Sequence, residues 1–135
     1  MIRYKSGYKY QLQQDYAIKI ELFPAENIHL DHITLTTGGE LRVNAGYCWD
    51  GASGPVPDTK ANMRAALVHD ALYQLMRHRE LDRAYYKKRA DTVFMILCIA
   101  DGVPTFLAKS YYKGLQWFGK AATLPKNAKK IITAP

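Results

Sequence analysis

Hydrophobic and polar residues alternate along the first 46 residues of the chain, a pattern typical of strands with one buried face. The alternating apolar positions are Tyr8, Tyr10 and Leu12, then Ile18, Ile20 and Leu22, then Leu41 and Val43. Pro24 interrupts the pattern, and Thr37-Gly38-Gly39 suits a hairpin turn because glycine adopts positive φ without strain. We therefore predict three to five short antiparallel strands in a small sheet.

From Asp58 onward the apolar residues recur with the helical period of 3.6. Asp58 or Thr59 can cap a first helix that ends around residues 77–79. A second helix is predicted over residues 80–100, antiparallel to the first because the connection is short, and a third over residues 104–121. The predicted fold class is α+β, with an N-terminal antiparallel sheet followed by a three-helix unit that contains an antiparallel helix pair.

A chain of 135 residues is long enough to bury a core and suits a single domain. Within it we expect a β-rich part over residues 1–46 and a Trp-Asp-Gly-Ala-Ser loop over residues 47–57. A helical part over residues 58–122 and a basic tail over residues 123–135 follow.

The formal net charge of +7 predicts attraction to an anionic partner, such as a phospholipid surface, a phosphorylated substrate or nucleic acid. No nucleic-acid motif is present, so specific nucleic-acid binding is not expected. Cys48 and Cys98 are too few for a disulfide framework. The longest apolar run, Val93–Ala100, is too short to span a bilayer, and no secretory signal is visible. The expected compartment is the cytoplasm.

Candidate chemistry concentrates where the loop meets the first helix. His69 is a candidate general base because imidazole exchanges protons near neutral pH. Asp91 on the antiparallel helix is the best candidate to orient the ring, and Tyr73, one turn after His69, would hydrogen-bond within the same site. His69 and Tyr73 lie at one edge of the apolar stripe, from which a side chain can reach both a cleft and solvent.

A metal ligand set can also be assembled around this helix. Asp70 is a candidate ligand, and the loop could add the Asp50 carboxylate and backbone carbonyls around Trp49 and Gly51. Oxygen ligands of this kind suit calcium, magnesium or another divalent cation.

Each candidate also has a structural interpretation. Asp70 could pair with Arg77 or Arg64, and Asp50 before a glycine could form a turn. Asp91 could pair with Lys87 or Lys88 at helical spacing, which contributes only about 0.3–0.5 kcal/mol on a surface.

Five motifs in a fixed order resemble a family of phage and prophage proteins of unknown function. They are G-Y-x-W-D-G-A-S-x-P, A-A-L-V-H-D-x-L-Y, R-A-D-x-x-F, D-G-V-P and W-F-G. The resemblance implies a phage or prophage origin. It implies a location in the cytoplasm of the infected or lysogenic bacterial host or in the virion, and it is compatible with a protein partner in phage or host.

The order His69-Asp70-x-x-Tyr73, followed by Asp91 on the next helix, also looks like the helix pair of secreted phospholipases A2. That resemblance implies that His69 is the base, Asp70 the calcium ligand, Asp91 and Tyr73 the orienting groups, and Trp49–Ser53 the calcium loop. The disulfides that flank the helix in those enzymes are missing here.

Two hypotheses follow. The first is a calcium-dependent ester hydrolase that acts on a phospholipid. The second is a non-enzymatic phage accessory, virion-associated or host-defence-inhibiting protein, in which the same residues form a structural lock.

Overall fold

The computed structural model spans the whole chain, and the residues described below are 4–5, 10–50 and 56–125. They fall into two compact units. The strand unit comprises the described residues up to Asp50, and the helical unit comprises residues 56–125. The expectation of a single domain stays a prediction.

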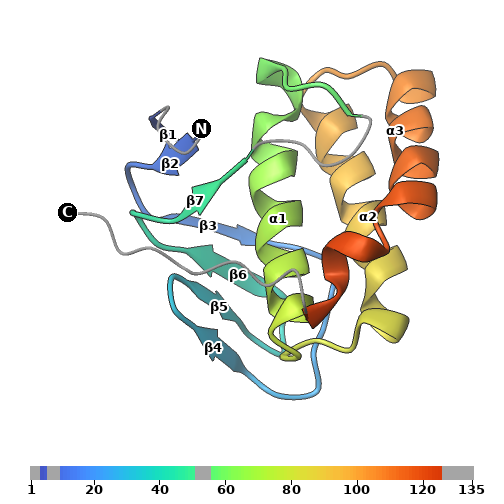
Figure 1. Cartoon of the computed structure of the whole chain (residues 1–135). Helices are drawn as coiled ribbons and strands as arrows, with labels where there is room; N and C mark the ends of the chain where they lie inside the picture. Colours follow the sequence, from blue (N-terminus) through green and yellow to red (C-terminus); the bar gives the residue numbers. More distant parts are fainter. Residues whose placement is uncertain (1–3, 6–9, 51–55, 126–135) are drawn as a thin grey trace. The chain divides into compact units, whose positions relative to one another are not determined.

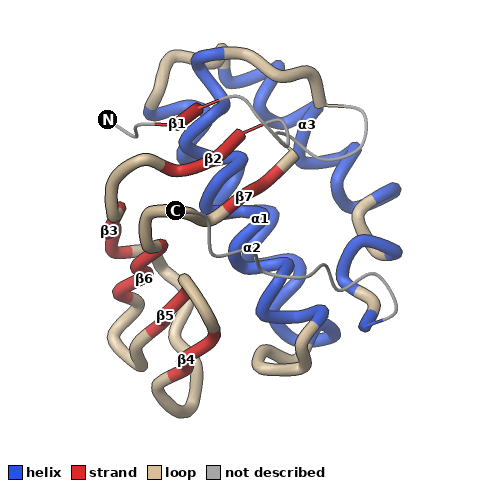
Figure 2. The backbone as a smooth tube through the Cα atoms, turned by 60° about the vertical axis from the view of Figure 1, so that its left-hand side comes forward, coloured by secondary structure: helices blue, strands red, loops and turns tan. Residues whose placement is uncertain are grey.

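The strand unit contains two antiparallel sheets (Figures 1 and 2). The smaller sheet has the order β1-β2-β7, and the larger has the order β3-β6-β5-β4. The strands are β1 (Tyr4–Lys5), β2 (Tyr10–Leu12), β3 (Tyr16–Lys19), β4 (Ile28–Leu30), β5 (Ile33–Leu35), β6 (Glu40–Val43) and β7 (Cys48–Trp49).

Alternation sets the two faces of the larger sheet. Leu41 and Val43 of β6 are buried while Glu40 and Arg42 are exposed, and Ile33 and Leu35 of β5 are fully buried. The β5–β6 turn contains Gly39 with a φ of +85°, where a Cβ atom would collide with the Ile20 carbonyl. The glycine predicted to form this hairpin turn is therefore required by both conformation and space.

β7 lies at the start of the segment that the sequence predicts to be a loop. It pairs with β2, with Trp49 opposite Tyr10 and their ring centroids 5.5 Å apart. Trp49 is 1% exposed. A large aromatic residue favours a strand when a cross-strand partner covers it, and the local Gly-rich pattern does not reveal that partner.

The helical unit consists of three helices and two short 3-10 turns in the described residues. These elements are η1 (Lys60–Asn62), α1 (Met63–Arg77), α2 (Arg83–Ala100), α3 (Thr105–Phe118) and η2 (Ala121–Thr123). At the start, the Thr59 N–H donates to Asn62 Oδ1 at 3.0 Å, and Asn62 Nδ2 donates to the Pro57 carbonyl at 2.7 Å. At the end of α2, Gly102 has a φ of +105°, which lets the chain turn towards α3.

α2 packs against both α1 and α3, and η2 packs against α1 (Figure 1). Every residue of α1 except Arg64 is buried. The predicted α+β class, with antiparallel strands followed by three helices, is confirmed.

Candidate functional site

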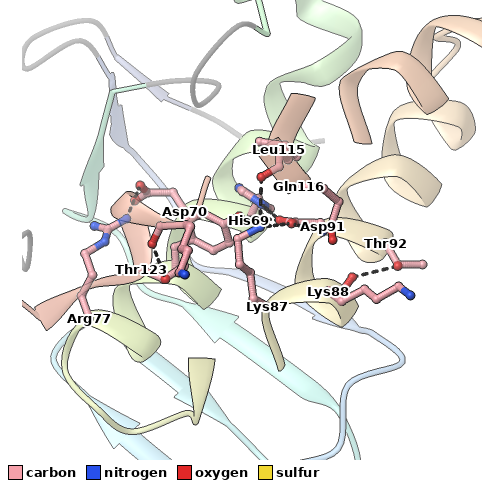
Figure 3. Close-up of polar contacts among 12 residues, drawn as sticks. His69, Asp70, Arg77, Lys87, Lys88, Asp91, Thr92, Leu115, Gln116 and Thr123 are labelled. Carbon is pink, nitrogen blue, oxygen red and sulfur yellow. Dashed lines mark hydrogen bonds and ion pairs between the residues drawn. The ribbon is translucent and has the colours of Figure 1, made fainter. Parts of the chain in front are cut away.

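The carboxylate of Asp91 accepts four hydrogen bonds from three helices (Figure 3). Oδ1 lies 2.7 Å from His69 Nε2 and 2.5 Å from the Tyr73 hydroxyl, both on α1. Oδ2 accepts from Lys87 Nζ of α2 at 2.7 Å and from Gln116 Nε2 of α3 at 2.6 Å. Asp91 itself is fully buried. We call these five residues the Asp91 network.

The surroundings of Asp91 keep it ionised. Burial alone raises the pKa of this carboxyl, but the hydrogen bond and charge of His69, with the hydrogen bonds of Lys87 and Tyr73, outweigh it. The net result is a pKa below the usual value. An ionised carboxylate is only an acceptor, so His69 Nε2 and the Tyr73 hydroxyl must both donate to it.

The His69 ring is held on its faces as well as by Asp91. Its centroid lies 4.0 Å from that of Tyr73 and 5.2 Å from that of Phe94, and the side chain is almost completely buried. Within the described part of the chain, the hydrogen bond of the ring is made through Nε2. Because Nε2 carries the proton towards Asp91, the lone pair lies on Nδ1 whenever the ring is neutral.

Tyr73 is locked in its protonated form. Burial raises the pKa of its hydroxyl well above the ordinary value, and the neighbouring negative charge of Asp91 raises it further. Gly119 lies against the same hydroxyl, since a Cβ atom there would be 2.5 Å from the Tyr73 oxygen and 2.6 Å from the Leu115 carbonyl. The lack of a side chain at Gly119 lets the chain after α3 approach the tyrosine closely.

Lys87 donates two hydrogen bonds rather than one. Besides Asp91, its ammonium donates to the Leu115 carbonyl of α3 at 3.0 Å, and its side chain is 14% exposed. The spacing from Lys87 to Asp91 predicts a helical ion pair, but one on a surface. The structure confirms the ion pair and shows that it is buried. Removing one of its two side chains should therefore lower the stability of the fold far more than breaking a surface pair does.

Asp70 belongs to a second polar cluster along α1. Arg77 donates to Asp70 Oδ1 at 3.4 Å, to Gln74 Oε1 at 2.8 Å and to the Ala122 carbonyl of η2 at 2.6 Å. Arg77, one of the two predicted partners of Asp70, forms an ion pair with it. Arg64, the other, pairs with Asp101 at 2.9 Å.

The predicted catalytic residues and the predicted metal ligands differ in outcome. His69, Tyr73 and Asp91 come together. The edge of α1 that carries His69 and Tyr73 was expected to reach solvent, but it is buried. In the strand unit, Trp49 is buried and Asp50 is exposed, and Gly51 lies outside the described residues. Within the described ranges no group of three or more His, Cys, Asp or Glu side chains is arranged to bind a metal ion. The metal ligand set stays a prediction.

Gln116 was not anticipated by the sequence reasoning. It lies on the polar side of α3 and is an exposed residue, so the helical pattern marks it as a surface residue. Its side chain nevertheless reaches Asp91 Oδ2. The available signal was indirect: a buried carboxylate with two acceptor oxygens requires several donors, and the helix after α2 is a natural source of one.

The fold and the site define an α+β protein whose three helices share a buried His–Asp hydrogen-bond network. A family model described as "Protein of unknown function (DUF1353)" matches residues 30–115, which is more than half of the chain. The chain belongs to this family. Searches of curated proteins and of solved structures gave no match.

Proposed function

We propose that the protein is an ester hydrolase in which His69 is the general base. One observation carries the proposal: His69 Nε2 is bound at 2.7 Å to a carboxylate that is held ionised and also accepts from Tyr73. This arrangement fixes the imidazole tautomer and directs the basic lone pair to Nδ1. It is the pairing of a base with an orienting acid that proton-transfer catalysis requires.

The reaction would use water as the nucleophile. Nδ1 of His69 takes a proton from water as the water oxygen forms a bond to the ester carbonyl carbon. The tetrahedral intermediate then collapses with cleavage of the bond to the alkoxy oxygen, which receives the proton from Nδ1. The products are a carboxylic acid and an alcohol. Asp91 stabilises the imidazolium formed between the two steps, and Tyr73 holds Asp91 in place.

A divalent cation, with calcium first, is part of the proposal. In the helical unit Asp70 would be its ligand, because a carboxylate oxygen is a hard donor of the kind that calcium prefers. A bound cation would polarise the ester carbonyl. The guanidinium of Arg77, 3.4 Å from Asp70 Oδ1, competes for the same carboxylate, so cation binding would require this long ion pair to open.

A phospholipid is the proposed substrate class. Supporting it are the net charge of +7 and the likeness of the His69-Asp70-x-x-Tyr73 order to phospholipases A2. A phage or prophage origin, with action in the host cytoplasm or from the virion, is proposed on the resemblance of the motifs alone.

The test is hydrolysis of a phospholipid ester by the purified protein, with and without calcium. His69→Asn should abolish turnover, and Asp70→Asn should abolish its calcium dependence. His78→Asn is the matched control, because His78 caps α1 and its side chain contacts Gln74 at 3.0 Å, outside the Asp91 network. Hydrolysis that survives His69→Asn at the wild-type rate would refute the assignment of the base.

A second function is favoured by one specific observation, the burial of the Asp91 network. His69 is 1% exposed and Asp91 0% exposed, and both carboxylate oxygens are occupied. In this alternative the network is a structural lock in a non-enzymatic phage accessory, virion-associated or host-defence-inhibiting protein. It predicts that His69→Asn lowers stability while the wild-type protein hydrolyses no ester, so the same two measurements separate the alternatives.

A further inference from the structure

Large apolar side chains are exposed on two helices of the helical unit. Among the described residues these are Tyr85, Ile96 and Ile99 on α2 and Phe106 and Trp117 on α3. Phe106 is 76% exposed and Trp117 80% exposed. Single exposed apolar residues need no explanation, but two aromatic side chains that are both largely exposed to solvent on one helix do.

α3 has two distinct faces. Ala108 and Leu115 are buried on the inner face, which packs against α2. The outer stripe consists of Phe106, Lys109, Lys113 and Trp117, none of which is buried. At 3.6 residues per turn these four residues lie within about 80° of one another around the helix axis, along roughly 16 Å of its length. The stripe therefore presents an aromatic ring near each end and two ammonium groups between them.

The charged residues of α3 have a single sign. Lys109 and Lys113 belong to the outer stripe, Lys120 follows it, and the chain contains no Asp or Glu after Asp101. No acidic side chain of α3 can therefore neutralise these lysines. The surface is complementary to a dense array of negative charge that also offers an apolar layer.

We propose that the outer stripe of α3 docks on an anionic phospholipid surface, with the helix axis parallel to it. Tryptophan and phenylalanine suit the boundary between headgroups and acyl chains, and lysines extend their ammonium groups to lipid phosphates. Nucleic acid fits less well, because the stripe lacks arginine, whose planar fork gives bidentate phosphate and base contacts. No helix in the described residues is long and apolar enough to cross a membrane, so the contact is peripheral. The idea that this docking brings a substrate to His69 rests on the proposed function. The binding to the membrane surface does not depend on it.

Binding is measured with vesicles of ether-linked phosphatidylcholine containing ether-linked phosphatidylglycerol, which have no carboxylic ester to hydrolyse. The chain has two tryptophans, of which Trp49 is already buried, so a blue shift of emission on binding reports Trp117. We expect the shift with the mixed vesicles, little with phosphatidylcholine alone, and loss of the signal change in Trp117→Phe.

The charge is tested by a matched pair of double variants. A lysine close to an anionic membrane contributes a factor of about five in affinity, so Lys109→Gln/Lys113→Gln should bind about 25-fold more weakly in sedimentation. Lys19→Gln/Lys60→Gln removes the same charge from exposed positions elsewhere and should bind like the wild type. Equal weakening in both pairs, no binding to the mixed vesicles, or tighter binding to duplex DNA than to them would each overturn the proposal. Because these lipids contain no carboxylic ester, failure of the proposed hydrolysis leaves this result unchanged.

Discussion

Replacing Asp91 by asparagine isolates the energetic role of the Asp91 network. The amide keeps an oxygen that can accept from His69 and Tyr73, so the shape of the side chain and half of its contacts survive. The new NH2 group faces Lys87 and Gln116, which are both donors to Oδ2 in the native protein. The substitution therefore leaves the mostly buried ammonium of Lys87 without its counter-charge. It also places the new NH2 group, a donor, opposite the donors of Lys87 and Gln116.

The expected loss of stability is large. Removal of one partner from a buried ion pair costs about 3–5 kcal/mol, and the retained Oδ1 contacts place Asp91→Asn at the lower end, about 3 kcal/mol. With a urea dependence of about 1–3 kcal/mol per molar for a small protein, the unfolding midpoint should fall by about 1–3 M.

The assay is urea unfolding followed by far-ultraviolet circular dichroism, and the control is Asp101→Asn. This control makes the same chemical change in an ion pair with Arg64, whose two side chains are 25% and 28% exposed. Loss of such a pair costs about 1 kcal/mol or less. If Asp91→Asn were no less stable than Asp101→Asn, the network would not hold the helices together and the reasoning would fail.

The dependence of the unfolding free energy on pH in the acidic range provides a second test of the same variant. The pKa of Asp91 is lower in the folded protein than in the unfolded chain, where a carboxyl titrates near about 3.9. Its contribution is therefore complete above that value and is lost as the pH falls through the folded pKa. Asp91→Asn should depend less on pH in this range than the wild type does. A pH dependence in this range that is identical in the two proteins would contradict the assignment.

Three further outcomes can be checked directly. Gly119→Ala should destabilise by about 1–3 kcal/mol in thermal unfolding, because its methyl group meets the Tyr73 hydroxyl, whereas Gly38→Ala, with its nearest neighbour 3.9 Å away, should be nearly neutral. The raised pKa of Tyr73 means that its contribution is complete below about pH 10 and declines as the pH rises towards the folded pKa, so the wild type should lose more stability than Tyr73→Phe in alkaline urea titrations. Burial raises the pKa of Cys98 to about 12, so a thiol reagent near neutral pH should label Cys48 first and Cys98 only on unfolding; equal labelling rates would contradict this.

The sequence predicted the helical unit well because its elements depend on local rules. The 3.6 period locates α1 and α2, Gly102 marks the end of α2, and the third helix was expected within a few residues of Thr105–Phe118. β7 was missed because its formation depends on the distant Tyr10. Pairing between residues far apart leaves no mark in the local pattern of hydrophobic and polar positions.

The contact of His69 and Tyr73 with Asp91 was predicted, but its burial was not. The spacing of His69 and Tyr73 places them one turn apart on one face, and Asp91 needs only an antiparallel second helix to reach them. The helical wheel treats a stripe edge as half exposed, yet α1 is buried on nearly every side. Gln116 and the second contact of Lys87 depend on how α3 packs on α2, which no local spacing determines.

Lys87 should have opposite effects on the stability of the fold and on the proposed catalysis. Its ammonium lies 2.7 Å from Asp91 Oδ2, so part of the carboxylate charge is already neutralised before His69 accepts a proton. A lock gains from this arrangement, because a buried carboxylate with a counter-charge is far cheaper to bury than a bare one. In a catalyst the same arrangement is unfavourable, because a partly neutralised Asp91 stabilises the His69 imidazolium less. If hydrolysis occurs, Lys87→Met should therefore weaken the fold and, measured per folded molecule, increase the ability of Asp91 to support the base. Stability and turnover that both fall in proportion would indicate instead that Lys87 acts only by holding the helices in place.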